Sequence, residues 1–130
     1  MRIIKFRGKD IETGEWVYGD LHVLCDRPHI HHTEQTAYPY AGKRSFVDLE
    51  TIGQFTGLVD KNGKEIYEGD IIKEDNLIHK ILWIDEASAF CRCDLEYMDI
   101  RYRISRDAMS YVEIIGNVFD NTELLKGGKQ

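Results

Sequence analysis

Apolar and polar residues alternate along much of the chain, and this pattern predicts β-strands. Residues 16–24 have one apolar side, while the aromatic residues Trp16 and Tyr18 fall on the opposite side together with polar residues. The same alternation puts Cys25 on the apolar side, so we expect this cysteine to be a small core residue. The apolar run at residues 77–84 is typical of a strand covered on both faces. These patterns predict a mainly β protein.

A second alternating stretch, residues 89–104, predicts a β-hairpin. Cys91 and Cys93 fall on its apolar side, and a tight turn at Met98-Asp99 would place Cys93 opposite Ile104. Two thiolates on one strand face can share a zinc ion, but zinc needs four ligands. No second Cys-x-x-Cys or His-x-His of fitting phase stands nearby in the sequence. We therefore expect Cys91 and Cys93 to be core residues.

A second hairpin is predicted around Asn62-Gly63, which separates the apolar pairs Leu58-Val59 and Ile66-Tyr67. An Asn-Gly pair tolerates the positive φ angles that a two-residue type I′ turn requires, so Val59 should pair with Ile66. Gly69 then interrupts the second strand, and such a glycine usually marks a bulge or bend. Bent strands of this kind close small barrels.

The hairpin at Asn62-Gly63 lies within residues 53–71, which read GQFTGLVDKNGKEIYEGDI. This stretch resembles the hallmark of the YopX family of bacteriophage and prophage proteins. Both ends of the chain also resemble the family in order and spacing: IKFRGK at 4–9 with GEWVYG at 14–19, and IGNVFDN at 115–121 with ELL at 123–125. The resemblance covers the whole chain, although the segment from Cys25 to Arg44 matches no family motif. It implies an SH3-like barrel in the C-terminal part and a phage or prophage origin, and it supplies no catalytic residues.

The patterns and the resemblance together predict three parts of the chain. We expect an N-terminal β lobe at residues 1–51, a small SH3-like β-barrel domain at 52–125, and a flexible tail at 126–130. Short helical turns should begin at Ser105 and Asn121, both of which are suitable N-cap residues.

Composition and charge narrow the location and the partners. The formal net charge is −6, and residues 53–130 contribute most of it. Such an acidic balance disfavours nucleic acid as a partner, because phosphate binding needs clustered lysine and arginine. Three cysteines cannot all pair within one chain, and neither a secretory signal nor a membrane-spanning run is present. We expect free thiols, no membrane association and a cytoplasmic location in the bacterial host.

One basic stripe runs against the acidic balance. Lys5, Arg7 and Lys9 alternate with Ile4 and Phe6, so a strand would present the three cations on one face. The simplest interpretation is a solvated strand face, and the alternative is a contact surface for phosphates. Four aromatic residues are further candidate binding residues, or else they fill the seam between the two lobes: Trp16, Tyr18, Phe55 and Tyr67.

A cluster of histidines lies in the segment that matches no family motif. His29 and His31 would share one strand face, but Pro28 and Pro39 punctuate the segment and indicate a loop. We expect a solvent-exposed loop here. The alternative is a metal or catalytic site formed by His29, His31 and His32, which requires three ligands in a defined geometry.

Three functional hypotheses remain open. The first is a noncatalytic phage or prophage accessory protein that binds another protein or a second copy of itself, without a cofactor. The second is a small barrel that binds nucleic acid through Lys5, Arg7, Lys9 and the aromatic residues. The third is a metal-dependent enzyme that uses the histidine loop. No Gly-x-Ser-x-Gly elbow and no phosphate-binding glycine loop occur in the sequence.

Overall fold

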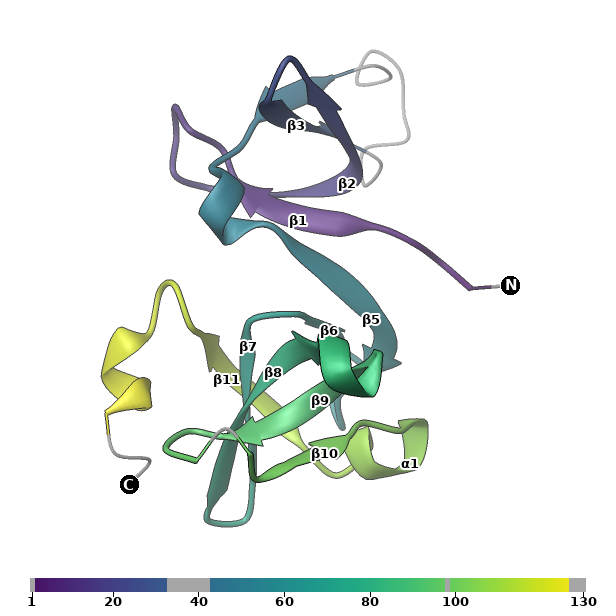
Figure 1. Ribbon diagram of the computed structural model, residues 1–130, viewed down its shortest axis with the longest axis vertical. Coiled ribbons are helices and arrows are strands. Elements are labelled where there is room, and N and C mark those ends of the chain that lie inside the picture. The colour runs from purple at the N-terminus through teal and green to yellow at the C-terminus, as the bar shows by residue number, and fades with distance from the viewer. Residues whose placement is uncertain (1, 33–42, 98, 127–130) are drawn as a thin grey trace. The chain divides into compact units, whose positions relative to one another are not determined.

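A computed structural model describes residues 2–32, 43–97 and 99–126, and within them the protein is mainly β (Figure 1). Pro39, Met98 of the predicted tight turn, and all but one residue of the predicted tail lie outside these ranges. The chain forms two compact units, Met1–Phe55 and Thr56–Gln130, which are called unit 1 and unit 2 below.

Unit 1 is an antiparallel sheet with the strand order β4-β3-β2-β1-β5. Its strands are β1 (Phe6–Lys9), β2 (Trp16–Leu24), β3 (Arg27–His32), β4 (Arg44–Phe46) and the first part of β5 (Gly53–Val59). Ile30 and Val47 are buried in this unit. A 3₁₀ turn at Leu49–Thr51 begins at Asp48, whose carboxylate accepts a hydrogen bond from the Glu50 backbone.

The β2–β3 connection corrects the prediction for Cys25. Leu24 pairs with Arg27, so Cys25 and Asp26 form a two-residue turn, with φ angles of +52° and +62° respectively. Positive φ at both central residues is the signature of a type I′ turn. Cys25 is exposed, not in the core, because the alternating pattern stops where the chain reverses.

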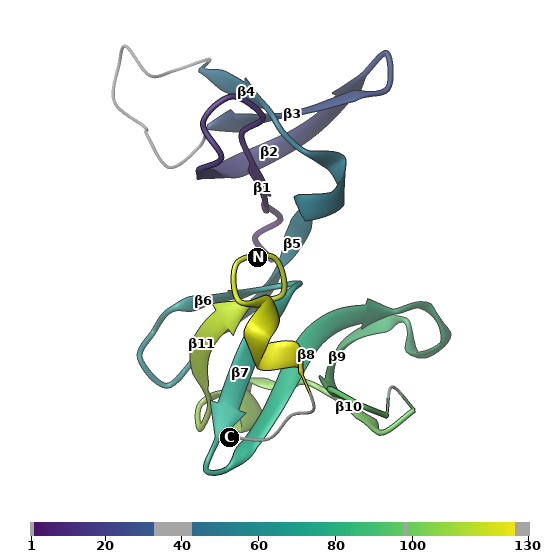
Figure 2. The same cartoon turned by 90° about the vertical axis from the view of Figure 1, so that its left-hand side faces the viewer.

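Unit 2 contains a second antiparallel sheet with the order β10-β9-β8-β7-β11 (Figure 2). The strands of this sheet are β7 (Asp70–Glu74), β8 (Leu77–Ile84), β9 (Ala89–Asp94), β10 (Arg101–Arg103) and β11 (Glu113–Asn117). Unit 2 also contains β6 (Glu65–Tyr67), which neighbours β5, and helix α1 (Arg106–Met109). Two 3₁₀ turns lie at Asp85–Ala87 and Thr122–Leu125. The pairings between described residues leave this sheet open, with β10 and β11 at its edges, so a closed barrel is not confirmed.

The core of unit 2 comes from separate elements of this unit. Ile66, Ile72, Ile81, Met109 and Val112 form one buried cluster. Helix α1 supplies Met109, and Ser105 caps this helix as predicted by accepting a hydrogen bond from the Ala108 backbone. Burying such side chains stabilises each by about 1.5–3 kcal/mol relative to leaving it exposed.

Two predicted hairpins have different turns from those expected. At residues 60–64 the Gly63 backbone N–H donates to the Asp60 carbonyl, so Lys61 and Asn62 are the central residues and only Gly63 has positive φ. At residues 94–101, Cys93 pairs with Arg101 rather than with Ile104. The Asp94 carboxylate accepts the N–H groups of Glu96 and Tyr97, which lengthens the loop and moves the register.

Candidate functional site

One face of the unit 1 sheet collects cationic and aromatic side chains. Arg7 pairs with Tyr18, and Lys9 pairs with Trp16. The Phe55 backbone N–H donates to the carbonyl of Lys5 on the neighbouring segment. Because paired residues of antiparallel strands project to the same side, the predicted basic stripe and these rings share one face.

The cations on this face lie against aromatic rings. The Arg7 guanidinium carbon is 4.6 Å and the Lys9 Nζ atom 5.4 Å from the centre of the Trp16 ring. Lys5 Nζ lies 5.4 Å from the centre of the Phe55 ring. These distances are within the range of cation–π attraction. The structure thus brings together six of the seven predicted binding residues in unit 1, while Tyr67 belongs to unit 2.

The same face continues onto β3 and β4. His29 pairs with Phe46, and His31 pairs with Arg44. The guanidinium carbons of Arg27 and Arg44 lie 4.2 Å and 6.0 Å from the centre of the Phe46 ring. Sequence reasoning missed Arg27, Arg44 and Phe46, because they lie in or beside the segment that was expected to be a loop.

This surface is called the basic face below and is defined by five cations and three rings: Lys5, Arg7, Lys9, Arg27, Arg44, Trp16, Phe46 and Phe55. Among the described strand positions on this side of the sheet, Asp20 is the one carboxylate. The chain is acidic as a whole, so folding concentrates positive charge on this side of unit 1.

Exposure differs along the basic face. Arg27 and Arg44 are exposed and Phe46 is half-buried, whereas Arg7 is buried and Phe55 has 7% of its surface exposed. Trp16 and Tyr18 are half-buried. The predicted binding residue Tyr67 is only 2% exposed. The part of the basic face most accessible to a partner is therefore formed by Arg27, Arg44 and Phe46.

Three histidines meet on the same side of the sheet. His22 pairs with His29 across β2 and β3, and His31 follows two residues later on β3. The ring centres are 5.5 Å apart for His22 and His29, 4.3 Å for His22 and His31, and 5.1 Å for His29 and His31. These residues, called the histidine cluster, lie on regular strands, so the expected loop is wrong.

The structure does not bring His32 together with His29 and His31. His32 follows His31 directly on β3, so it projects to the opposite side, where its Nε2 atom lies 2.8 Å from the Ser45 hydroxyl. His29, by contrast, is 4% exposed and its Nδ1 atom has no hydrogen-bond partner among the described residues. Burial, followed by the neighbouring His22, His29 and Arg44, lowers the pKa of His31, while Asp20 opposes this shift.

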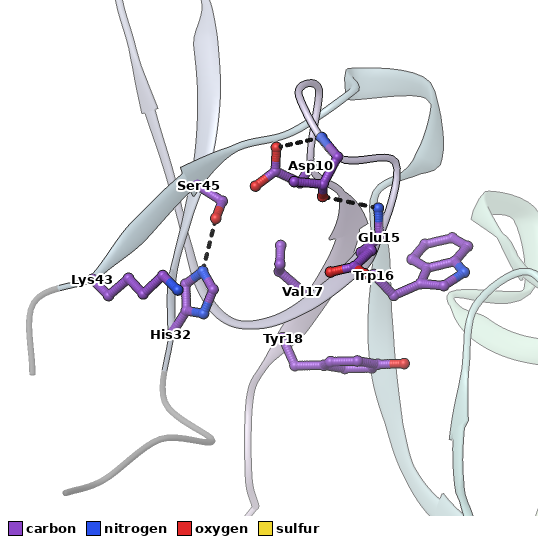
Figure 3. A pocket seen from close by; sticks show the side chains of 9 residues that line it. Asp10, Glu15, Trp16, Val17, Tyr18, His32, Lys43 and Ser45 are labelled. Atoms are coloured by element: carbon purple, nitrogen blue, oxygen red, sulfur yellow. Dashed lines mark hydrogen bonds between the residues drawn. The ribbon is translucent and has the colours of Figure 1, made fainter. Parts of the chain in front are cut away.

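A polar pocket of about 280 Å³ lies on the opposite side of β2 and β4 from the basic face (Figure 3). Val17 points into it, whereas the rings of Trp16 and Tyr18 point away. It is lined by Asp10, Thr13, Glu15, Trp16, Val17, Tyr18, His32, Lys43 and Ser45. Two of its residues, His32 and Ser45, are of types used in nucleophilic catalysis.

The electrostatics of this pocket follow from short contacts. The Glu12 backbone N–H, 2.8 Å from Asp10 Oδ1, is the main reason that the pKa of Asp10 is lowered, and the Ser45 hydroxyl contributes. Burial and then Lys43 lower the pKa of His32, while Asp10 opposes this shift. In a catalytic triad the carboxylate orients the histidine through a hydrogen bond, whereas here the hydrogen bond of His32 is made with Ser45, and Asp10 acts on His32 through its charge. This arrangement is that of a polar network joining β3, β4 and the turn before β2.

The cysteines of unit 2 are core residues, as predicted. Cys91 and Cys93 are buried. Burial, and then the neighbouring Cys91, raises the pKa of Cys93, so its thiol stays protonated at neutral pH. A protonated buried thiol is neither a nucleophile nor a ready metal ligand.

Comparisons with known proteins give a family and a fold. The family model described as YopX protein matches residues 5–126. The crystal structure of protein EF1440 from Enterococcus faecalis is similar, with a TM-score of 0.57 and 25% sequence identity, and the match covers 97% of this chain and 100% of that chain. No curated protein matches. None of the helices in the described residues is both long and apolar enough to cross a membrane.

Proposed function

The chain belongs to the YopX family, and we propose that it is a noncatalytic phage or prophage accessory protein that binds an acidic segment of another protein in the host cytoplasm. The observation that carries the proposal is the exposed end of the basic face. There the exposed residues Arg27 and Arg44 place their guanidinium groups beside the ring of Phe46, which is half-buried. Arginine and aromatic residues are the side chains that most often dominate binding energy at protein interfaces.

Charge selects the kind of partner. Guanidinium groups bind carboxylates through two parallel hydrogen bonds, and Asp20 is the one carboxylate among the described strand positions on the same side of the sheet as the basic face. An acidic peptide segment therefore complements this surface. A second copy of the chain is one possible source of such a segment, because the chain carries a net charge of −6.

A noncatalytic role is supported by the chemistry of the polar pocket. The Oδ1 atom of Asp10 accepts the backbone N–H groups of Glu12 and Thr13, and the hydrogen bond of His32 is made with Ser45, so the carboxylate is held by the turn instead of by the histidine as in a triad. The metal-dependent enzyme considered from the sequence needed His29, His31 and His32 together, and His32 lies on the other side of its strand.

The SH3-like character of unit 2 is part of the same proposal. The successive antiparallel strands β7, β8, β9 and β10 and the positive φ of Gly69 before β7 support a small, open relative of such barrels. Units of this kind often present loops and strand edges to partners, although a fold does not fix a function.

The test is affinity purification of the tagged protein from phage-bearing cells, with quantitative mass spectrometry and with or without nuclease. Wild type should retain a stoichiometric partner with an acidic segment after nuclease treatment. The double variant Arg27→Glu/Arg44→Glu should retain at least about tenfold less, since two charge-assisted contacts become repulsive. The matched control Lys64→Glu/Lys73→Glu reverses two exposed charges of unit 2 and should bind like wild type.

Equal capture by wild type and by the Arg27→Glu/Arg44→Glu variant, with unchanged melting temperatures, would contradict the proposal. Sedimentation of the pure protein over a range of concentrations tests the second-copy source. A concentration-dependent dimer that the same variant abolishes would identify the chain itself as the partner.

Nucleic acid is the second candidate, because folding does place Lys5, Arg7 and Lys9 beside Trp16 and Phe55. It ranks second because the cations already lie over these rings, and stacked bases would have to displace them. It predicts a steep loss of affinity with salt and a capture that disappears with nuclease.

The variant Trp16→Ala separates an interface role of this ring from a structural one. Its ring packs against Arg7 and Lys9, so we expect the melting temperature to fall as these contacts are lost. Lost partner binding with an unchanged melting temperature would instead make Trp16 a contact residue.

A further inference from the structure

We propose that His22, His29 and His31 form a binding site for a divalent transition metal, with Zn²⁺ as the ion expected. The inference does not rest on the proposed function, since it uses the side chains between β2 and β3 and needs no partner protein.

The strand register brings three imidazoles within reach of one point. His29 and His31 are two positions apart on β3 and project to the same side, and His22 lies directly opposite His29 on β2. This backbone arrangement suits a three-histidine metal site, because two histidines lie one residue apart on one strand and the third lies opposite them on the neighbouring strand. The ring centres already lie within 5.5 Å of one another.

His29 supplies an independent observation. Its side chain is 4% exposed, and its Nδ1 atom is buried without a hydrogen-bond partner among the described residues. Buried polar atoms of native proteins nearly always have a hydrogen-bond partner or a metal ion as partner, so we expect a partner for this atom. A metal ion held by the cluster, together with the change of ring orientation it requires, would give this imidazole its missing partner.

The rings must turn to bind. His22 and His29 stack with an angle of 14° between their planes, so their nitrogens do not point at a common centre. Correspondingly, no three His, Cys, Asp or Glu side chains in the described parts of the chain already have a ligand arrangement. Binding would turn the rings about their side-chain torsions, while the strand pairing holds the three backbone positions side by side.

The ligand type selects the metal. Imidazole nitrogens suit Zn²⁺, Cu²⁺ and Ni²⁺, whereas Mg²⁺ and Ca²⁺ prefer oxygen ligands. Three histidines leave the fourth tetrahedral position of Zn²⁺ for water. Arg44, which pairs with His31, opposes a dication, while Asp20 pairs with His31 from the other side and favours it. We therefore expect micromolar rather than nanomolar affinity.

The experiment is a titration of the full, metal-stripped chain, without a polyhistidine tag, with Co²⁺ and then with competing Zn²⁺. Tetrahedral Co²⁺ gives a visible absorption band, and Zn²⁺ should displace one equivalent of it. The Cys25→Ser background removes the exposed thiol at the neighbouring turn as a ligand. His22→Ala and His31→Ala should each weaken binding at least about tenfold, while His79→Ala, in unit 2, should bind like its parent.

Urea unfolding followed by the fluorescence of Trp16 gives a second readout, with Trp83→Phe used to silence the other tryptophan. At a free Zn²⁺ concentration of about 100 times its Kd, the folded-to-unfolded ratio of unit 1 should rise about 100-fold, and His22→Ala should remove this rise. His22 is exposed, so its replacement leaves the fold intact.

Three results would overturn the site. The first is no Zn²⁺ binding by the wild-type chain at millimolar metal. The second is equal affinity in the His22→Ala, His31→Ala and His79→Ala variants, which would indicate scattered surface histidines. The third is binding that vanishes in Cys25→Ser yet persists in His22→Ala.

Discussion

Asp60 joins two backbone segments of unit 2 by accepting three N–H groups with one carboxylate. Its Oδ1 atom accepts the N–H groups of Asn62 and Lys64, each at 2.9 Å, and its Oδ2 atom accepts the N–H of Ile114 at 3.1 Å. The side chain is 4% exposed, so water cannot replace these bonds. A single residue thus ties the turn after β5 to β11.

The variant Asp60→Asn should destabilise unit 2 by about 3 kcal/mol, because it removes the charge and leaves at least one buried N–H unsatisfied. Urea denaturation followed by the fluorescence of Trp83 measures the loss. Asp75→Asn is the matched control, since Asp75 is exposed and asparagine tolerates its φ of +55°. A loss below about 0.5 kcal/mol for Asp60→Asn would show that these bonds are replaceable.

His79 makes the stability of unit 2 depend on pH. Burial, followed by Arg92, lowers the pKa of His79, while Asp94 and Glu74 oppose this shift. The unfolded chain therefore takes up the proton at a higher pH than the folded chain. The free energy of unfolding should fall as the pH drops below about 6.5, and the fall should end once the folded-state pKa is passed.

The variant His79→Gln should unfold with a shallower dependence on pH between 7 and 5, measured as the urea midpoint reported by Trp83. The backbone N–H groups of Tyr97 and Glu96 lower the pKa of Asp94 from the ordinary value of an aspartate, which moves its titration further away from that window. Parallel pH profiles for wild type and His79→Gln would show that His79 is not the cause of the pH dependence of stability.

At the scale of elements, the β2–β3 hairpin carries an unusual turn. Cys25 and Asp26 both have positive φ, a conformation in which glycine or asparagine is normally found. Cys25→Asn should stabilise unit 1 by about 1 kcal/mol, measured by urea denaturation with Trp16 as the reporter. Cys25→Ala keeps the cost of the left-handed conformation and should not stabilise. Equal effects of the two substitutions would point to the lost thiol instead.

The β11 strand depends on close contact with the turn that follows it. A Cβ atom added at Gly116 would lie 2.5 Å from Asn121 Oδ1, and that oxygen accepts the N–H of Asn117 at 3.0 Å. The oxygen therefore cannot withdraw without losing its hydrogen bond, and we expect Gly116→Ala to destabilise unit 2 by about 2 kcal/mol or more.

The double variant Gly116→Ala/Asn121→Gly tests this cause. Removing the Asn121 side chain relieves the overlap, so the two substitutions together should cost clearly less in urea denaturation than the sum of the single costs. Additive costs would mean that Gly116 is required for some other reason.

Hairpins show where sequence reasoning about elements reaches its limit. Both predicted hairpins form, between β5 and β6 and between β9 and β10, but both have a register different from the predicted one. In both cases an aspartate carboxylate, from Asp60 or Asp94, accepts backbone N–H groups inside the turn and adds residues to it. Apolar alternation cannot reveal such side-chain bonds, and one or three extra residues change which side chains face each other.

At the scale of the whole molecule, family membership and the mainly β fold follow from local motifs, and so does the basic stripe of Lys5, Arg7 and Lys9. The rest of the candidate site cannot be predicted from local motifs. Arg27 and Arg44 are far apart in sequence, and only the β3–β4 pairing brings them to one ring. The histidine cluster was similarly hidden, because Pro28 indicated a loop, yet this proline is accommodated within β3 opposite Val23.

Strand β5 limits where the chain can be divided into two fragments. It pairs with β1 in unit 1 and neighbours β6 after it has entered unit 2, so the boundary after Phe55 falls inside a strand. Halves divided there would each keep only a fragment of β5 and should reassemble poorly when produced together. A division at the exposed turn Asp75-Asn76 leaves every strand whole and should complement better. The two units are therefore not interchangeable modules, and recombination between relatives should succeed only where β5 is inherited intact.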